Sequence, residues 1–306
     1  MSAGSEAAAQ VWRAVLLMLA SACLFGCMAV VIRLASAQLH PFEIAFFRNL
    51  FGLVFALPLL LRHGSGLLKT SKLPLYVFRS AIGIVSMLCG FWAIVNLPLA
   101  QAVSLSYSTP LFVTIGAVLV LGEVVRARRW TAVALGFVGV ILILRPGAEF
   151  SPGVLVALLA AALSAAVAIS IKFLSRTEKP DAIVLYTTLL WVPMSLLPAL
   201  WVWENPQGVT WLWIVLAGFF GTAGHMCWAR ALKLGEASML TPISFLQVPI
   251  VAAAGYLLFE EYLDAWIVAG AAIIFFANAY IAHREAQLAR RAVTDPEIAR
   301  EPPAPR

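Results

Sequence analysis

Long apolar runs recur along the whole chain, and they restrict the fold more than any other feature of the sequence. Most are about 18 to 22 residues long with hardly a charge inside, the length that an α-helix needs to cross roughly 30 Å of hydrocarbon. The 306 residues are 62% hydrophobic and only 12% charged, which excludes an ordinary soluble domain. The sequence therefore predicts an all-α polytopic membrane protein.

Ten membrane crossings are expected from the apolar runs and the charged or helix-breaking segments between them. Their approximate ranges are 13–36, 43–62, 75–95, 99–121, 129–145, 152–174, 181–202, 210–231, 237–258 and 264–282. Segment 1–12 lacks the basic residues of a cleaved signal, so the first helix is expected to be retained. The charged, proline-rich tail 283–306 is expected to be disordered.

Basic residues are concentrated in alternate loops between the crossings. One face of the predicted bundle collects nearly all of them, whereas the other keeps little beyond Arg33 and Arg145. By the positive-inside rule the basic face is cytoplasmic, which places both termini in the cytoplasm and the protein in the inner or plasma membrane. The net charge of +6 is explained by this orientation, so no nucleic-acid partner is expected.

The two halves of the chain resemble each other. A shift of 139 residues places "PFEIAFFRNL" (41–50) on "PDAIVLYTTL" (180–189), and a shift of 138 places "LVLGE" (119–123) on "LLFEE" (257–261). Because five is odd, the second copy of a five-helix unit is inverted in the membrane. Residues 13–147 and 148–282 are thus predicted to form two inverted five-helix repeats, an architecture of many secondary transporters.

Charged residues that match between the repeats are interpreted as parts of the scaffold. Glu123 and Glu261 occupy matching helix ends, where capping or interfacial roles are expected. Arg33 likewise matches Lys172, and both are interpreted as cations at helix ends that reach the lipid headgroups.

Two arginines lack a counterpart, since Arg48 matches Thr187 and Arg79 matches Ala217. The shared fold therefore requires neither charge, although a central arginine costs about 2.5 to 3.5 kcal/mol on insertion scales. Arg48 has two interpretations, a contact with an outward cavity or substrate and an anchor in the headgroups. Arg79 is placed at the cytoplasmic entrance, where it either meets the substrate or anchors the helix. The nearest acid to Arg48, Glu43, is five residues away and faces another direction.

His225 lies near the centre of the eighth predicted crossing, and Met87 occupies its place in the first repeat. A histidine there can carry a coupled proton, bind substrate, or simply bond to a neighbouring carbonyl. Gly218, Gly221 and Gly224 precede it at intervals of three, which allows another helix or a ligand to approach closely.

Hydroxyls, aromatic rings and prolines mark a second group of candidates. "SLSYSTP" in crossing four contains Tyr107 and Ser108, and "TPISFLQVP" in crossing nine contains Gln247. Prolines near mid-depth free backbone carbonyls for a midplane site, or only kink the helices. Trp92 and Trp228 could stack on a flat substrate or pack in the core or against lipid.

The chemistry missing from the crossings also restricts the function. No Asp or Glu lies deep inside a predicted helix, which disfavours a multidrug cation exporter and favours an anionic, zwitterionic or neutral aromatic metabolite. Zinc-protease motifs and a nucleophile elbow are absent, so an intramembrane enzyme is not expected. The four cysteines are interpreted as packing residues, and neither a metal site nor a cofactor is expected.

Several motifs together resemble the drug/metabolite transporter superfamily, EamA type. They are "FRNLFG", "FRSAIG", "NLPLAQAVSLSYSTPLFV", "LGE" and "FLQVPIVAAAGYLLFEE", and the resemblance spans about residues 13 to 282. The opening stretch is also similar to the branch with S-adenosylmethionine and riboflavin carriers. One departure is Glu260, where the family pattern usually has glycine.

The resemblance implies a carrier of small metabolites with a central cavity between helices 3, 4, 8 and 9 and parts of 1 and 6. We therefore expect a secondary transporter that works by alternating access, with a small-molecule substrate, the lipid bilayer and a coupled proton as its partners. The expected substrate contacts are Arg48, Trp92, Tyr107, Ser108, His225, Trp228 and Gln247, with Arg79 at the cytoplasmic entrance.

Overall fold

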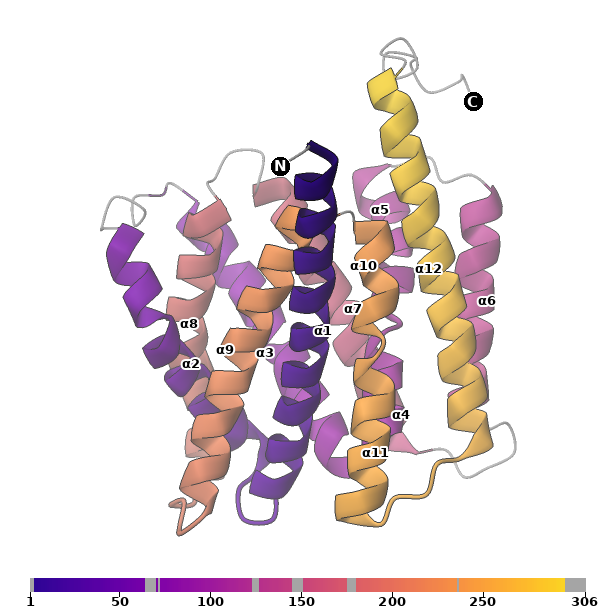
Figure 1. Ribbon diagram of the computed structural model, residues 1–306. Coiled ribbons are helices and arrows are strands. Elements are labelled where there is room, and N and C mark those ends of the chain that lie inside the picture. The colour runs from indigo at the N-terminus through magenta and orange to yellow at the C-terminus, as the bar shows by residue number, and fades with distance from the viewer. Residues whose placement is uncertain are drawn as a thin grey trace.

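The computed structural model describes residues 3–63, 70, 72–122, 127–144, 151–174, 180–235 and 237–294. All regular structure among these residues is α-helical, and the helices run between the same two faces (Figure 1). They are α1 (Ala3–Ala35), α2 (Pro41–His63), α3 (Leu73–Asn96), α4 (Leu99–Ser106), α5 (Thr109–Leu121), α6 (Ala127–Leu144), α7 (Pro152–Leu174), α8 (Pro180–Leu200), α9 (Thr210–Leu234), α10 (Ala237–Ser244), α11 (Gln247–Phe259) and α12 (Ala265–Thr294).

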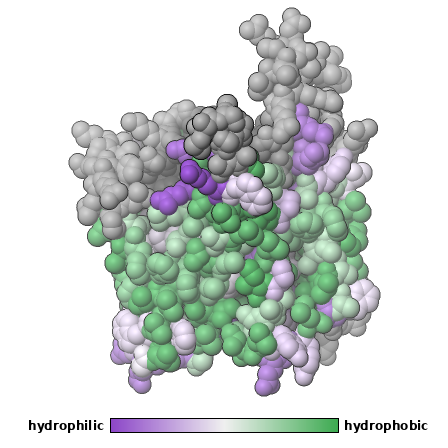
Figure 2. Space-filling model, viewed as in Figure 1, coloured by the Kyte–Doolittle hydropathy of each residue, from purple (hydrophilic) through white to green (hydrophobic). Residues whose placement is uncertain are grey.

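The surface of the bundle fits a membrane. Seven helical segments among the described residues are long and apolar enough to span one, and shorter apolar segments lie in α6 and α8. Figure 2 shows a continuous hydrophobic band between more hydrophilic margins. α1 begins and α12 ends on one side, called here the terminus face, and the other side is called the opposite face (Figure 1). The prediction of a multi-pass helical membrane protein is confirmed.

Crossings four and nine, which the sequence predicted as single helices over 99–121 and 237–258, are each divided in two. α4 is followed by α5, and α10 by α11, with a two-residue turn between them. All four segments begin and end at positions that the 138-residue shift superposes. Pro110 and Pro249 lie in the first turns of α5 and α11, where a missing N–H is tolerated although it would break a helix interior. The twelve helices therefore make ten crossings.

The packing of the helices follows the inverted repeat. α1 packs along α9 just as α7 packs along α3, and α2 packs on α9 just as α8 packs on α3. α1 also contacts α10 and α11, as α7 contacts α4 and α5, while α6–α12 and α2–α8 join the two repeats. These matching contacts, from helices that run in opposite directions, confirm two inverted five-helix repeats.

The first and last helices are longer than the apolar runs predicted. α1 begins at Ala3 instead of near residue 13, and α12 continues to Thr294 instead of ending near residue 282. Both additions are rich in alanine, glutamate, glutamine, leucine or arginine, which favour helix outside a membrane as well. Hydropathy marks only the part of a helix that lies in lipid.

One charged contact ties the two repeats together at the opposite face. Arg33 at the end of α1 pairs with Glu261 after α11, at 3.1 Å between Nη2 and Oε1. Its Nη1 also donates to the carbonyls of Ile94 and Leu97, at 2.6 and 3.1 Å. Glu261 Oε2 accepts the N–H of Leu99 at the start of α4, at 2.7 Å. Arg33 thus binds helix ends of the protein, whereas the sequence placed it in the headgroups.

Glu260 is the one described residue other than glycine with a positive φ, at 54°. It ends α11 in the left-handed conformation, and its counterpart Gly122 ends α5 in the same conformation, with φ of 66°. A Cβ in this conformation costs about 1 to 2 kcal/mol. Because the fold sets this backbone angle, the position favours the glycine that the family pattern usually has.

We expect Glu260→Gly to stabilise the protein by about 1 kcal/mol, or roughly 2 to 3 °C in apparent melting temperature. The physical reason is the removal of a Cβ from a left-handed cap. Thermal unfolding in detergent measures the change, and Glu260→Ala is the matched control because it removes the carboxylate and keeps the Cβ. Equal gains from both variants would assign the effect to charge instead of backbone strain.

Candidate functional site

The Arg48 side chain is directed into the bundle. Arg48 lies about 10 Å along α2 from its start at the opposite face. Its guanidinium reaches Gly221, where an added Cβ would lie 2.8 Å from both Nε and Nη2. Since Gly221 is about 16 Å along α9 from the same face, the side chain points toward the middle of the membrane. Gly221 thus provides the space that the guanidinium occupies.

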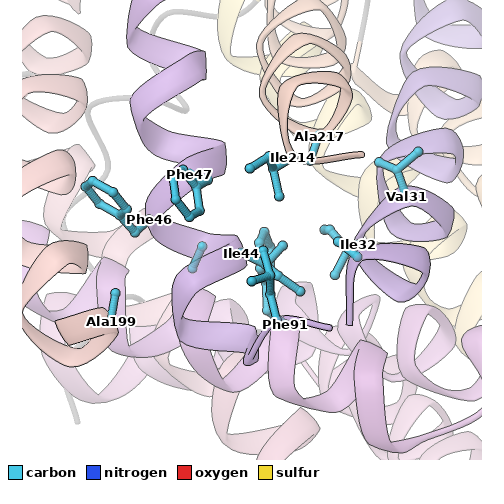
Figure 3. Packing of buried hydrophobic residues seen from close by; sticks show 12 residues of the cluster. Val31, Ile32, Ile44, Phe46, Phe47, Phe91, Ala199, Ile214 and Ala217 are labelled. Atoms are coloured by element: carbon cyan, nitrogen blue, oxygen red, sulfur yellow. The ribbon is translucent and has the colours of Figure 1, made fainter. Parts of the chain in front are cut away.

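An apolar cluster separates Arg48 from the opposite face. Figure 3 shows its members, which come from α1, α2, α3, α8, α9 and the turn between α1 and α2, and include Ile32, Ile44, Ala199 and Ile214, close to the ends of their helices. Arg48 itself is only 9% exposed. The headgroup anchor, one of the two interpretations of the sequence, does not fit this geometry, because an anchoring arginine extends toward the interface.

A short polar chain holds Arg48 in place. Its Nη1 donates to Asn49 Oδ1 at 3.1 Å, and Asn49 Nδ2 donates to Ser195 Oγ on α8 at 3.2 Å. Ser195 in turn donates to the carbonyl of Trp191 at 2.6 Å. The Nε of Arg48 has no hydrogen-bond partner among the described residues. Asn49 and Ser195 are buried polar side chains that the sequence analysis missed, although Asn49 directly follows Arg48 in "FRNL".

Arg79 lies in the other half of the membrane, about 9 Å along α3 from the terminus face. It is 6% exposed, so it does not extend into water. Its Nη1 donates to Thr187 Oγ1 on α8, and its Nε has no partner in the described part of the chain. Thr187 is the residue that matches Arg48 in the repeat alignment. Two buried arginines therefore lie at corresponding helix crossings.

His225 faces a region that the surrounding helices do not fill. Its Nδ1 lies 2.7 Å from the carbonyl of Gly221, one turn earlier on α9, and Phe25 packs edge-on at 4.8 Å between ring centroids. The residue as a whole remains exposed. With Nδ1 bonded to the backbone, Nε2 is the nitrogen left to bind a ligand or a proton. Gly221 therefore contacts both residues: its carbonyl binds His225, and Arg48 occupies the space beside its Cα.

The two helix breaks meet in the centre of the bundle. Tyr107, after α4, packs on Phe245, after α10, with ring centroids 4.0 Å apart and ring planes tilted by 33°. The Tyr107 hydroxyl donates to the Ser244 carbonyl at 2.5 Å and lies 3.2 Å from Gln247 Oε1. Asn278 on α12 donates to the Tyr107 carbonyl at 2.7 Å. Tyr107 and Gln247 thus connect crossings four and nine, and Asn278 is a further contact that the sequence analysis did not identify.

The remaining candidate residues differ in how deeply they are buried. Ser108 is fully buried and donates to the carbonyl of Leu105 at 2.7 Å, so its hydroxyl is occupied. Trp92 is partly buried on α3, and Trp228 is 44% exposed on α9, one turn beyond His225. Glu123, the expected partner of Glu261 in the scaffold, lies outside the described residues.

Inverted repeats, helix breaks at matching positions and buried polar groups between them define a multi-pass membrane protein of the transporter type. The model of the EamA-like transporter family matches residues 12–145 and again 151–282. The chain therefore belongs to the EamA-like transporter family, within the drug/metabolite transporter superfamily that its motifs resemble. The two matches cover one repeat each.

Several relatives of this chain are named as carriers of small molecules. An S-adenosylmethionine uptake transporter of Rickettsia felis is 30% identical over 84% of this chain and 87% of its own. A riboflavin transporter of Vibrio cholerae is 33% identical over 73% and 76% of the two chains. A pseudopaline exporter of Pseudomonas aeruginosa is 28% identical over 86% and 93%. A solved structure with 21% identity aligns at a TM-score of 0.60 over 94% of this chain and 98% of its own, which supports the fold.

Proposed function

We propose that this protein is a secondary transporter that moves a small metabolite across the inner or plasma membrane by alternating access. The observation that carries the proposal is the meeting of two broken helices at the bundle centre, at positions that the repeat makes equivalent. Two similar, inverted halves can exchange conformations and thereby expose one central site to each side in turn. The names of the relatives support transport of small molecules over catalysis.

The proposed substrate site comprises polar and aromatic side chains of α2, α3 and α9 and of the two helix breaks. Arg48 would contact an anionic group, His225 would offer Nε2, and the exposed ring of Trp228 would stack on a flat group. Tyr107, Gln247 and Trp92 would form the wall at the helix breaks. This set suits an anionic, zwitterionic or neutral aromatic metabolite. Both termini are proposed to be cytoplasmic, in line with the basic loops of the terminus face.

Transport in proteoliposomes tests the proposed function. Purified protein is first screened by thermal shift against S-adenosylmethionine, riboflavin and a panel of amino acids and nucleosides, because a ligand that binds the folded state raises its apparent stability. Compounds that raise the melting temperature are then offered in radiolabelled form to proteoliposomes. We expect at least one to be transported faster than by protein-free liposomes. Binding without any transport by the reconstituted protein would contradict the proposal.

If His225 carries a coupled proton, replacing it should change the pH dependence of transport. In the unaltered protein, proton-driven transport is expected to vary between about pH 5 and 8, the range in which histidine titrates. His225→Gln keeps a hydrogen-bonding side chain but cannot titrate, so its pH profile should be flat there. The control is His283→Gln, which changes an exposed histidine at the end of the apolar part of α12. A pH profile in His225→Gln like that of the unaltered protein would remove the proton from the proposal.

A further inference from the structure

The two buried arginines lie at two equivalent helix crossings, each formed by one helix from either repeat. Arg48 is on α2, which packs on α9, and Arg79 is on α3, which packs on α8. In the repeat alignment α2 corresponds to α8 and α3 to α9, so these two packing pairs are equivalent. One crossing lies toward the opposite face and the other toward the terminus face.

The arginine comes from the other partner at each crossing. At the α2–α9 crossing the charge comes from α2, and the position on α9 that matches Arg79 is Ala217, fully buried. At the α3–α8 crossing the charge comes from α3, and the position on α8 that matches Arg48 is Thr187, which accepts the hydrogen bond of Arg79. Each crossing therefore contains one arginine, although the helix that provides it differs. A comparison of single positions presents both arginines as asymmetric, whereas the packed structure shows one charge at each of the two equivalent crossings, both supplied by the first repeat.

Neither guanidinium is compensated by the described part of the protein. The ion pair that the described residues form is Arg33–Glu261 at the opposite face, and it includes neither Arg48 nor Arg79. Glu43, the acid nearest to Arg48 in sequence, instead accepts the N–H groups of Glu204 at 2.8 Å and His40 at 3.2 Å. Both arginines keep an Nε without a partner while more than nine-tenths buried. Because a guanidinium does not lose its proton, two positive charges stay buried and available to an anion.

We propose that Arg48 and Arg79 form two equivalent anion-binding positions, one in each half of the membrane, which bind the same carboxylate or phosphate group of a transported molecule in turn. This inference rests on the proposed transport function and adds the substrate class, a metabolite with an anionic group. Guanidinium groups bind carboxylates and phosphates through two parallel N–H donors, and an unpartnered Nε can supply one of them. The inverted repeat places such a donor on each side of the midplane.

Simple anions test this binding directly. In lipid-free detergent at matched ionic strength, acetate or phosphate should raise the melting temperature of the unaltered chain by several degrees more than chloride does. Arg48→Thr and Arg79→Ala should each remove about half of this shift, and the combined variant should remove all of it. The inference is overturned if acetate and phosphate act no differently from chloride, or if the combined variant keeps the full shift.

Moving each arginine to the partner helix of its crossing is the sharper test. If an arginine were only structural, moving it to the other helix should not restore the anion-dependent shift. Arg79→Ala combined with Thr187→Arg moves the charge nearer the terminus face from α3 to α8. Arg48→Thr combined with Ala217→Arg moves the charge nearer the opposite face from α2 to α9. We expect either double variant to recover at least half of the anion-dependent shift lost in its single variant. Since Ala217 is fully buried, the Thr187 variant, at a less buried position, decides the question if the other does not fold. No recovery in a folded double variant would overturn the equivalence.

Two further arms identify the source of the anion. Titration with phosphatidylglycerol distinguishes a lipid headgroup, because stabilisation by this lipid alone that disappears in both arginine variants would assign the positions to lipid and overturn the inference. Transport measurements distinguish a failure of the anion-binding inference from a failure of the proposed transport function. Arginine-independent transport of an uncharged metabolite would leave the transporter intact and remove the anion sites, whereas anion binding in a protein that transports nothing would contradict the proposed function alone.

Discussion

Replacing Arg48 with threonine, its counterpart in the second repeat, should reduce transport at least tenfold while leaving the protein as stable as before, or more stable. Transport should fall because the guanidinium that would bind the substrate is lost. Stability should not fall, because this buried charge has no carboxylate partner among the described residues and costs up to about 2.5 to 3.5 kcal/mol in a membrane. Transport in proteoliposomes and thermal unfolding in detergent measure the two effects separately.

Arg13→Thr is the matched control for this prediction. It makes the same substitution at an exposed position on α1, near the terminus face, so both transport and melting temperature should stay close to those of the unaltered protein. Opposite changes in activity and stability are typical of a residue kept for function. If Arg48→Thr lowered the melting temperature and the folded yield together, Arg48 would instead be a structural residue.

Glu261→Gln should destabilise the protein by about 2 kcal/mol, or roughly 4 °C in apparent melting temperature. The substitution removes the ion pair with Arg33 and weakens the acceptor for the Leu99 N–H, both at the opposite face. The two side chains are 22% and 14% exposed, so water replaces the lost contact only in part. Arg33 is then left partly buried without its carboxylate, which accounts for most of the expected cost.

Glu260→Gln is the control here, because it removes the same charge from the neighbouring residue, which is exposed. We expect it to change the melting temperature by less than about 1 °C, since exposed charges contribute little. Raising the salt concentration provides a second check. A loss in Glu261→Gln that vanished in high salt would mean that the contact is a screened surface pair and not a connection between the repeats.

The relation between sequence and structure is clearest at crossings four and nine. The apolar runs predicted two continuous helices there, because hydropathy averages over about twenty residues and does not register a two-residue turn. The prolines in "STP" and "QVP" were the visible signal, but proline can also kink a helix without ending it. Only the packing of Tyr107 on Phe245 shows that both helices stop and that the breaks meet.

The buried polar contacts were harder to predict, because they join residues far apart in the chain. Asn49 and Ser195 were not distinguished from other small polar residues, and the pairing of Arg33 with Glu261 spans 228 positions. The repeat alignment identifies equivalent positions in the two halves, such as Arg48 and Thr187. It could not show that Arg79 donates to that same Thr187, because contacts between helices depend on their packing.

The sequence by itself determined the membrane class, the number of crossings, the inverted repeat and the family motifs. These depend on the length of apolar runs and on residue order, which are properties of the chain alone. The tertiary structure decided where the buried charges point. A hydropathy scale assigns Arg48 one insertion cost wherever its side chain points, and only the space left by Gly221 on α9, beneath the apolar cluster of the opposite face, directs it inward.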